Sequence, residues 1–145
     1  MTRTRPGLPE SRPGVVSVIV VNYRGAEDTI TCLTSFKGID WPAERLELIV
    51  VENASGDDSA ARIRSAVPAA IVVEADVNTG FAGGCNLGVA HATGEYIAFI
   101  NNDARPAPGW LSAAVETLIG DPRIGCIASK VLDWAESSST TSTAH

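Results

Sequence analysis

The sequence predicts an α/β protein built on a doubly wound, mostly parallel β-sheet. Short apolar runs rich in valine and isoleucine alternate along the chain with segments whose apolar residues recur at helical spacing. Apolar runs without polar alternation are typical of strands buried on both faces, as in a parallel sheet covered by helices. The length of 145 residues suits one domain with one core. This alternation favours parallel strands joined by helical crossovers.

The first half of the chain predicts strands and helices in turn. Residues 15–21 form a nearly continuous β-branched run, the first strand. Residues 26–37 have apolar residues three or four apart and predict a helix, and residues 46–51 predict the second buried strand. Residues 57–67 begin with two acidic residues, which favour a helix N-terminus. Residues 71–73 are the third, short strand.

The second half continues the alternation. Residues 81–92 predict a helix despite their glycines, and residues 96–100 predict the fourth strand. Residues 110–119 form an amphipathic helix pattern. The short apolar run at residues 124–128 predicts a fifth strand.

The ends of the chain have a different composition from its middle. The first 14 residues are rich in proline and arginine and have no apolar pattern typical of a packed core. The last residues are mostly serine and threonine and have no such pattern either. The expected organisation is a disordered lead-in at 1–14, the domain at 15–133 and a disordered tail at 134–145. No stretch approaches the roughly 20 apolar residues of a membrane-spanning helix.

Charge and cysteine content narrow the function. The formal net charge is -6 and the sequence has no long basic cluster, which argues against nucleic acid as a partner. Cys32, Cys85 and Cys126 are far apart and form no C-x-x-C pair. We expect reduced thiols rather than disulfides or metal ligands.

Polar residues follow three apolar runs at the point where each run stops. Because the carboxyl ends of parallel strands meet at one edge of a sheet, we expect these residues to converge there, where ligands bind. Turns also favour Asn, Asp and Ser, so each cluster taken alone is equally consistent with an ordinary turn. The clusters are Asn22 with Tyr23, Glu52 with Asn53, and Asn101, Asn102 and Asp103.

Two neighbouring features predict a phosphate site. The strand at residues 96–100 delivers Asp103 to the sheet edge, where its carboxylate can hold a cation. A glycine-rich segment at residues 78–86 lies just upstream. Glycines allow close backbone approach to a ligand. Together these features predict a site for a metal-bound nucleotide phosphate.

Four segments, taken in order, resemble the family 2 glycosyltransferases, an inverting group with the Rossmann-like GT-A fold. These segments are residues 18–23, 50–55, 78–86 and 101–103. The resemblance covers about residues 15–133 and is closest to the rhamnosyl- and galactofuranosyltransferase-like branch of cell-surface polysaccharide synthesis. It implies that the chain is the nucleotide-sugar-binding half of a GT-A enzyme.

The resemblance implies a role in donor binding for each matching residue. Asn22 and Tyr23 would border the nucleotide pocket. Glu52, followed by Asn53, stands where the family usually has an Asp that accepts a hydrogen bond from the nucleobase. The segment beside the ribose and diphosphate would comprise Asn78, Gly80, Gly83, Gly84 and Asn86.

The resemblance also assigns a metal ligand. Asn101 and Asp103 match the two ends of the family's D-x-D motif, with Asn102 between them. Asp103 would hold Mg²⁺ or Mn²⁺ on the diphosphate. Asn101 replaces an acid, so we expect one protein carboxylate and several waters on the metal, which Mg²⁺ accepts.

The implied activity is inverting transfer from a UDP- or dTDP-linked sugar to a glycan or a lipid-linked acceptor. Inversion needs a general base, which in the family lies in the acceptor half, after the metal motif. Residues 134–145 have no core pattern. We therefore expect the base to lie beyond the chain end and the isolated chain to transfer sugar weakly or not at all. We expect a cytoplasmic location that allows peripheral association with the inner face of the membrane.

Two alternatives remain open from the sequence. One is a nucleotide-binding module without transferase activity, which suits a chain without an acceptor half. The other is a dinucleotide-binding oxidoreductase domain. G-x-G-x-x-G does not follow the first predicted strand, and no P-loop motif is present, which weakens the second alternative.

Overall fold

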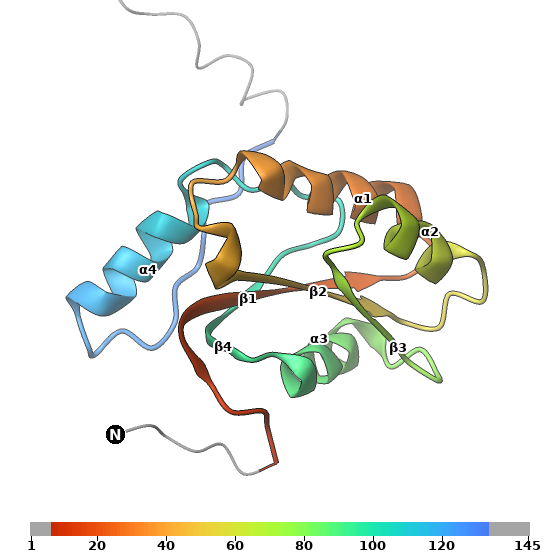
Figure 1. Cartoon of the computed structure of the whole chain (residues 1–145), viewed down its shortest axis with the longest axis horizontal. Helices are drawn as coiled ribbons and strands as arrows, with labels where there is room; N and C mark the ends of the chain where they lie inside the picture. The colour runs from red at the N-terminus through yellow and green to blue at the C-terminus, as the bar shows by residue number, and fades with distance from the viewer. Residues whose placement is uncertain (1–6, 134–145) are drawn as a thin grey trace, which may run out of the picture.

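Four parallel strands form the sheet of the computed structural model, which describes residues 7–133 (Figure 1). The spatial order is β3-β2-β1-β4, with all pairs parallel, so the predicted doubly wound α/β fold is confirmed. The strands are β1 (Arg12–Asn22), β2 (Leu46–Glu52), β3 (Ile71–Glu74) and β4 (Gly94–Phe99).

The central strand β1 is buried on both faces because its apolar residues point alternately to two helix layers. Val16, Val18 and Val20 pack in one core cluster, whereas Ile19 packs in a second cluster on the opposite face. All four are at most 1% exposed. The β-branched run therefore has the environment that its composition predicts.

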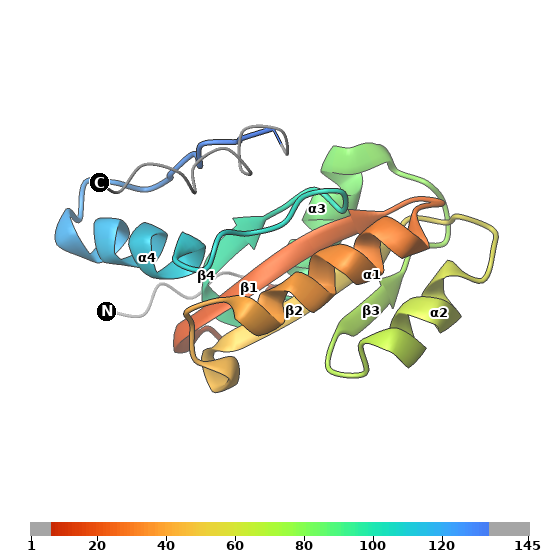
Figure 2. The same ribbon diagram turned by 90° about the horizontal axis from the view of Figure 1, so that it is seen from above.

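Helices cover both faces of the sheet (Figures 1 and 2). α1 (Ala26–Ser35) and α2 (Ser59–Ala66) lie over one face, and α3 (Gly80–His91) lies under the other. α4 (Trp110–Gly120) contributes to the core on the α1 side. Short 3₁₀ turns at Phe36–Gly38 and Ala43–Arg45 connect α1 to β2.

α3 packs close to the sheet because it presents glycines to β1. A Cβ added at Gly88 would lie 2.5 Å from Ile19 Cγ2, and one added at Gly84 would lie 2.8 Å from Val21 Cγ1. Both distances are too short for a real Cβ, so these glycines set the spacing between helix and sheet.

The predicted fifth strand at residues 124–128 is wrong. The segment pairs with no strand within residues 7–133, and most of its residues are exposed. It follows α4 instead, where Trp110 Nε1 donates a hydrogen bond to Ser129 Oγ at 2.6 Å. In Figure 2 the chain after α4 runs back outside the sheet. A short apolar run becomes a strand only when a neighbouring strand supplies hydrogen bonds for its backbone.

The termini need one correction. β1 begins at Arg12, so three residues expected in the disordered lead-in belong to the sheet, where Arg12 N donates to Thr93 O at 2.7 Å. The expected lead-in at residues 1–6 and the expected tail at residues 134–145 lie outside the described residues. Within residues 7–133, no helix has the length and hydrophobicity needed to cross a bilayer.

Candidate functional site

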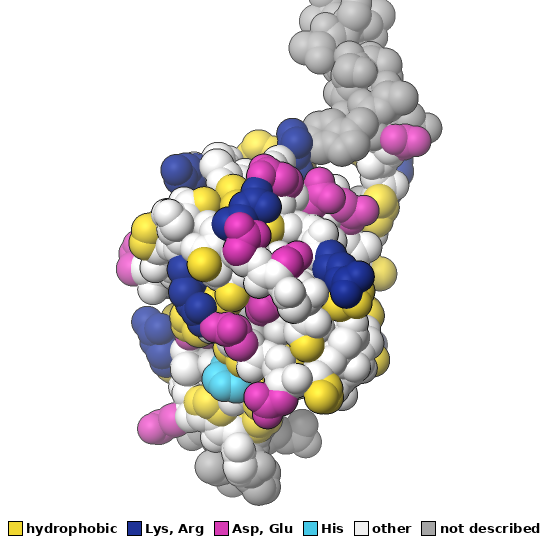
Figure 3. All heavy atoms as spheres, turned by 90° about the vertical axis from the view of Figure 1, so that its right-hand side faces the viewer, with side chains coloured by type: hydrophobic (Ala, Val, Ile, Leu, Met, Phe, Trp, Pro, Cys, Tyr) yellow, Lys and Arg dark blue, Asp and Glu magenta, His cyan; other side chains and the backbone are white. Residues whose placement is uncertain are grey.

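The carboxyl ends of the strands form the candidate site. The strand register places Asn22, at the end of β1, beside Glu52, at the end of β2. β4 lies on the other side of β1 and leads directly into residues 100–103. After β1 the chain continues to β2 on one side of β1, whereas β4 lies on the other side. The end of β1 is therefore a topological switch point, the position at which open α/β sheets bind ligands. Figure 3 looks onto this side and shows acidic and basic side chains interspersed.

The Glu52 carboxylate is turned into the protein and joins two strand ends. It is 5% exposed. Oε2 accepts a hydrogen bond from Asn22 Nδ2, and Oε1 accepts one from Ser55 N at 2.7 Å. Both carboxylate oxygens therefore have protein partners, and the expected contact between Glu52 and a nucleobase stays a prediction.

The loops after β1 and β2 hold each other. Ser55 Oγ accepts from Arg24 N at 2.8 Å, and Arg24 Nε donates to Ser55 O at 3.2 Å. Arg24 and Ala54 adopt φ angles of 55° and 59°, in the left-handed region that costs a non-glycine residue energy. Tyr23 is 46% exposed, with the Arg24 guanidinium carbon 5.2 Å from its ring centroid. Of the predicted pair at this strand end, Tyr23 therefore faces solvent whereas Asn22 is buried.

Thr29 of α1 joins the two sides of the switch point. Its hydroxyl donates to Asn22 Oδ1 at 2.7 Å and accepts from Asn102 Nδ2 at 3.3 Å. Thr29 is 0% exposed. No role was predicted for Thr29 from the sequence. Its signal is a hydroxyl on the inward stripe of α1, three residues after buried Ala26 and three before buried Cys32.

The turn after β4 presents Asn101 and Asp103 to solvent and keeps Asn102 half-buried. Beneath it, Cys32 Sγ donates to Asn101 O at 3.7 Å. Burial raises the pKa of the Cys32 thiol to about 11; the negative charge of Asp103 adds to this effect and the positive charge of Arg105 opposes it. Asp103 therefore lies near Cys32, at the β4 side of the switch point.

The donor set at this turn fits a cation shared with a phosphate ligand. No three His, Cys, Asp or Glu side chains gather into a metal-binding group anywhere in residues 7–133. Asp103 supplies an exposed carboxylate, and Asn101, two residues before it, is exposed as well. Mg²⁺ and Mn²⁺ accept such oxygen ligands, and Mg²⁺ commonly completes its shell with water and phosphate oxygens.

Asn53 anchors the start of the glycine-rich segment. Its Oδ1 accepts from Thr79 N at 3.1 Å, and its Nδ2 donates to Asn78 Oδ1 at 3.2 Å and to Gly80 O at 3.0 Å. Asn78 Oδ1 also accepts from Gly80 N at 2.8 Å. Asn53 is buried, whereas Asn78 and Gly80 are exposed. Asn53 thus positions the loop that is expected to border the ribose.

The remaining predicted residues lie on α3. Gly84 is buried against β1, and packing accounts for its lack of a side chain. A Cβ at Gly83 would lie 2.5 Å from Thr79 Cβ, so this glycine lets α3 begin close to the loop before it. Asn86 is exposed.

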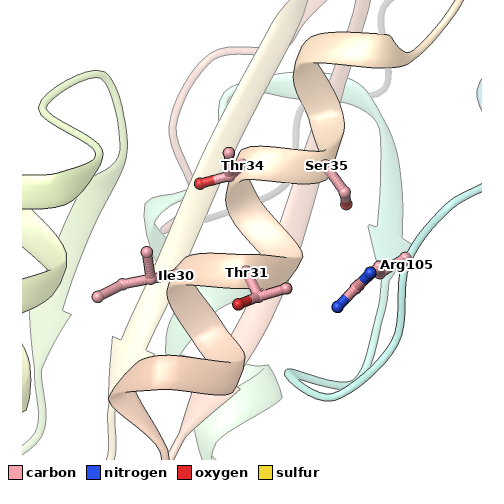
Figure 4. Close-up of a pocket in the computed structure, with 5 residues that line it drawn as sticks. All are labelled: Ile30, Thr31, Thr34, Ser35 and Arg105. Carbon is pink, nitrogen blue, oxygen red and sulfur yellow. The ribbon is translucent and has the colours of Figure 1, made fainter.

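A shallow pocket of about 330 Å³ lies beside this site, between α1 and the chain after β4. Figure 4 shows Arg105 directed toward α1. The lining residues are Ile30, Thr31, Thr34, Ser35 and Arg105, none of which is a predicted site residue.

Comparisons with known proteins agree with this geometry. The family model for glycosyl transferase family 2 matches residues 17–139. Glycosyltransferase AglE of Haloferax volcanii is 30% identical over 108 residues, which cover 72% of this chain and 36% of that protein. An uncharacterized glycosyltransferase of Mycobacterium tuberculosis is 28% identical over 106 residues, or 72% of this chain and 40% of that protein. The chain therefore spans less than half the length of these curated relatives.

Solved glycosyltransferase structures also resemble this chain. The mannosyltransferase PcManGT from Pyrobaculum calidifontis, in complex with GDP-Man and Mn²⁺, superposes with a TM-score of 0.71 at 32% identity. The match covers 85% of this chain and 37% of that one. S. aureus TarS 1-349 in complex with UDP superposes with a TM-score of 0.63 at 26% identity, over 73% of this chain and 32% of that one.

Proposed function

Since the chain belongs to glycosyl transferase family 2, we propose that its carboxyl sheet edge binds a nucleotide-diphosphate sugar together with a divalent cation, for inverting sugar transfer. The observation that carries the proposal is the hydrogen-bonded convergence of Asn22, Glu52 and Asn102 beside Asp103. Because the chain belongs to this family, the dinucleotide-binding oxidoreductase alternative is not proposed.

The predicted site residues divide into two groups by exposure. The exposed group would meet the donor, because its polar atoms face solvent at the sheet edge. Buried Asn22, Glu52 and Asn53 would hold the loops in place through the hydrogen bonds described above, and buried Gly84 would let α3 pack against β1. The exposed residues are Tyr23, Asn78, Gly80, Asn86, Asn101 and Asp103, the buried ones are Asn22, Glu52, Asn53 and Gly84, and Gly83 and Asn102 are half-buried between the two groups.

Asp103 would hold the cation, with waters and the donor's phosphate oxygens completing its shell. Mn²⁺ accompanies GDP-Man in the similar mannosyltransferase structure, which supports a divalent ion here, and we propose Mg²⁺ or Mn²⁺. A cation bound to the diphosphate would stabilise the negative charge that develops on the leaving group.

The donor is proposed to be UDP- or dTDP-linked. Similar structures contain UDP, UDP-GlcNAc and GDP-Man, so a GDP-linked sugar is the alternative donor to test. The acceptor is proposed to be a glycan or a lipid-linked sugar of cell-surface polysaccharide synthesis. The rhamnosyl-type branch, the cytoplasmic location and peripheral membrane association stay predictions.

A nucleotide-binding module without transferase activity is the second candidate. The matches cover only 36% and 40% of the curated relatives, so sugar transfer by this chain itself is a proposal that needs a direct test. Incubation of the chain with labelled nucleotide sugars and a glycan acceptor pool separates the two candidates. Sugar transfer supports the enzyme, whereas binding without transfer supports the module.

Calorimetry with Asp103→Ala tests the proposed cation site. We expect Mn²⁺ to tighten binding of UDP or dTDP to the wild-type chain, and GDP to bind more weakly than either. Asp103→Ala should remove most of this gain, on the order of tenfold in Kd, because a carboxylate and a divalent cation attract strongly where water is partly excluded.

Glu116→Ala is the matched control, since it removes one exposed carboxylate on α4, far from the ends of β1 and β2 (Figure 1). An equal Mn²⁺ enhancement in Asp103→Ala and Glu116→Ala would show that the cation binds elsewhere.

A further inference from the structure

A buried threonine hydroxyl connects the two halves of the proposed donor site. Thr29 is 0% exposed, and no residue of its own helix supplies its partners. Its acceptor is Asn22 at the end of β1, and its donor is Asn102 after β4. A hydroxyl both donates and accepts, so one side chain can satisfy an amide oxygen and an amide NH₂ at once.

The hydrogen bonds of Thr29 belong to a chain of side-chain hydrogen bonds that runs from Asn102 to Glu52, at the end of β2. Asn102 Nδ2 donates to Thr29 Oγ1, which donates to Asn22 Oδ1. Asn22 Nδ2 in turn donates to Glu52 Oε2. Each member has its orientation set by the next, because an amide has separate donor and acceptor ends. Three strand ends are thus linked by side chains as well as by the sheet.

The linked turn is the one that carries the proposed cation ligand. Asn102 lies between Asn101 and Asp103, so the direction of its side chain constrains the backbone that presents the Asp103 carboxylate. Gly25 lets Asn102 reach Thr29, because a Cβ at Gly25 would lie 2.8 Å from Asn102 Nδ2. The close approach of Asn102 to the start of α1 therefore depends on a glycine.

We propose that Thr29 is a positioning residue that couples the cation-binding turn to the nucleotide-binding strand ends. The inference rests on the proposed function. Mn²⁺ bound at Asp103 would fix the turn at residues 101–103. Through the Asn102–Thr29–Asn22 hydrogen bonds, the fixed turn would also hold the ends of β1 and β2, where the nucleotide is proposed to bind. The cation's direct contact with the diphosphate already makes the affinities for nucleotide and for metal depend on each other, and the connection through Thr29 strengthens that dependence.

Nucleotide titrations of Thr29→Val and Thr29→Ser, with and without Mn²⁺, test the coupling. Valine keeps the size of the side chain but removes the hydroxyl, whereas serine keeps the hydroxyl. With UDP as the probe, the ratio of Kd without Mn²⁺ to Kd with Mn²⁺ should fall about fivefold or more in Thr29→Val and stay within about twofold in Thr29→Ser. Melting temperatures measured in parallel report any general loss of stability.

Gly25→Ala tests the same coupling without changing Thr29. Its added Cβ should displace Asn102 and lower the Mn²⁺-dependent ratio in the same direction. Gly38→Ala is the matched control, because a Cβ at Gly38 meets nothing within 4 Å and lies at the other end of the α1 region. If Thr29→Val fails to fold, Gly25→Ala against Gly38→Ala decides the question.

The outcomes separate this inference from the proposed function. A folded Thr29→Val with the wild-type ratio, or an equal loss in Thr29→Val and Thr29→Ser, overturns the role of the hydroxyl. A wild-type chain that binds UDP with no Mn²⁺ dependence overturns the proposed cation site itself. A lowered ratio in Gly25→Ala and Thr29→Val, with Thr29→Ser and Gly38→Ala unchanged, supports the coupling.

Discussion

Cys32 makes the stability of the protein sensitive to alkaline pH. Burial and the nearby Asp103 raise the pKa of its thiol from 9.0 to about 11. The folded protein therefore holds this proton more tightly than the unfolded chain does. The stabilisation from this group is fully present below about pH 9 and is lost as the pH rises through about 11.

We expect the free energy of unfolding to fall more steeply with pH in wild type than in Cys32→Ala. The difference should reach on the order of 1–2 kcal/mol between about pH 8 and about pH 10.5 by linkage. Urea denaturation at several pH values measures it, with Cys126→Ala as a control that removes an exposed thiol. Parallel pH slopes in wild type and Cys32→Ala would contradict the assignment.

Single residues also show where sequence reasoning about the site stops. Strand ends and turn composition predict that Asn22, Glu52 and Asn53 lie at the carboxyl edge of the sheet, as they do, because a strand's last residue follows from its apolar run. They do not predict that these side chains turn inward, since that direction depends on partners distant in sequence, such as Thr79 for Asn53. Thr29 was missed because a threonine within a helix has no local signal of its tertiary partners.

At the scale of elements, the position of α3 depends on its glycines. Gly88→Ala should destabilise the protein by about 1–3 kcal/mol, because its Cβ would overlap Ile19 Cγ2 and the core is closely packed. Thermal or urea unfolding measures the loss. Gly120→Ala is the control: it also lies in a helix, but its Cβ would meet nothing within 4 Å. Equal stabilities of the two variants would show that α3 can move away from the sheet at little cost.

Elements were predictable where pattern and length agreed. β1, β2 and α1 follow from long apolar runs and from helical spacing, and their positions are confirmed within a few residues. The error at residues 124–128 has a different origin. Five residues of mixed Ile, Gly, Cys and Ala are compatible with a strand, but strand formation also requires a partner, which the local pattern does not contain.

At the scale of the whole molecule, the sheet order predicts a gradient of local stability. β1 pairs with neighbours on both sides, whereas β3 pairs only with β2 in the described sheet. Hydrogen exchange followed by mass spectrometry should therefore be slowest in β1, faster in β3 and fastest at residues 124–130, which belong to no ladder. Protection at residues 124–130 equal to that of β1 would contradict the absence of a paired strand there.

The central position of β1 also has a consequence for the growing polypeptide. β1 pairs with both β2 and β4, and β4 is the later of the two in the chain: the pairing of Ile19 with Phe99 joins residues far apart in the sequence. During synthesis, one edge of β1 has no partner until the ribosome has passed Phe99. The run at residues 15–21 is β-branched, uncharged and free of proline, which is the composition of aggregation-prone segments. The strand order that builds the switch point therefore leaves the nascent chain most exposed to misassociation between the synthesis of β1 and that of β4.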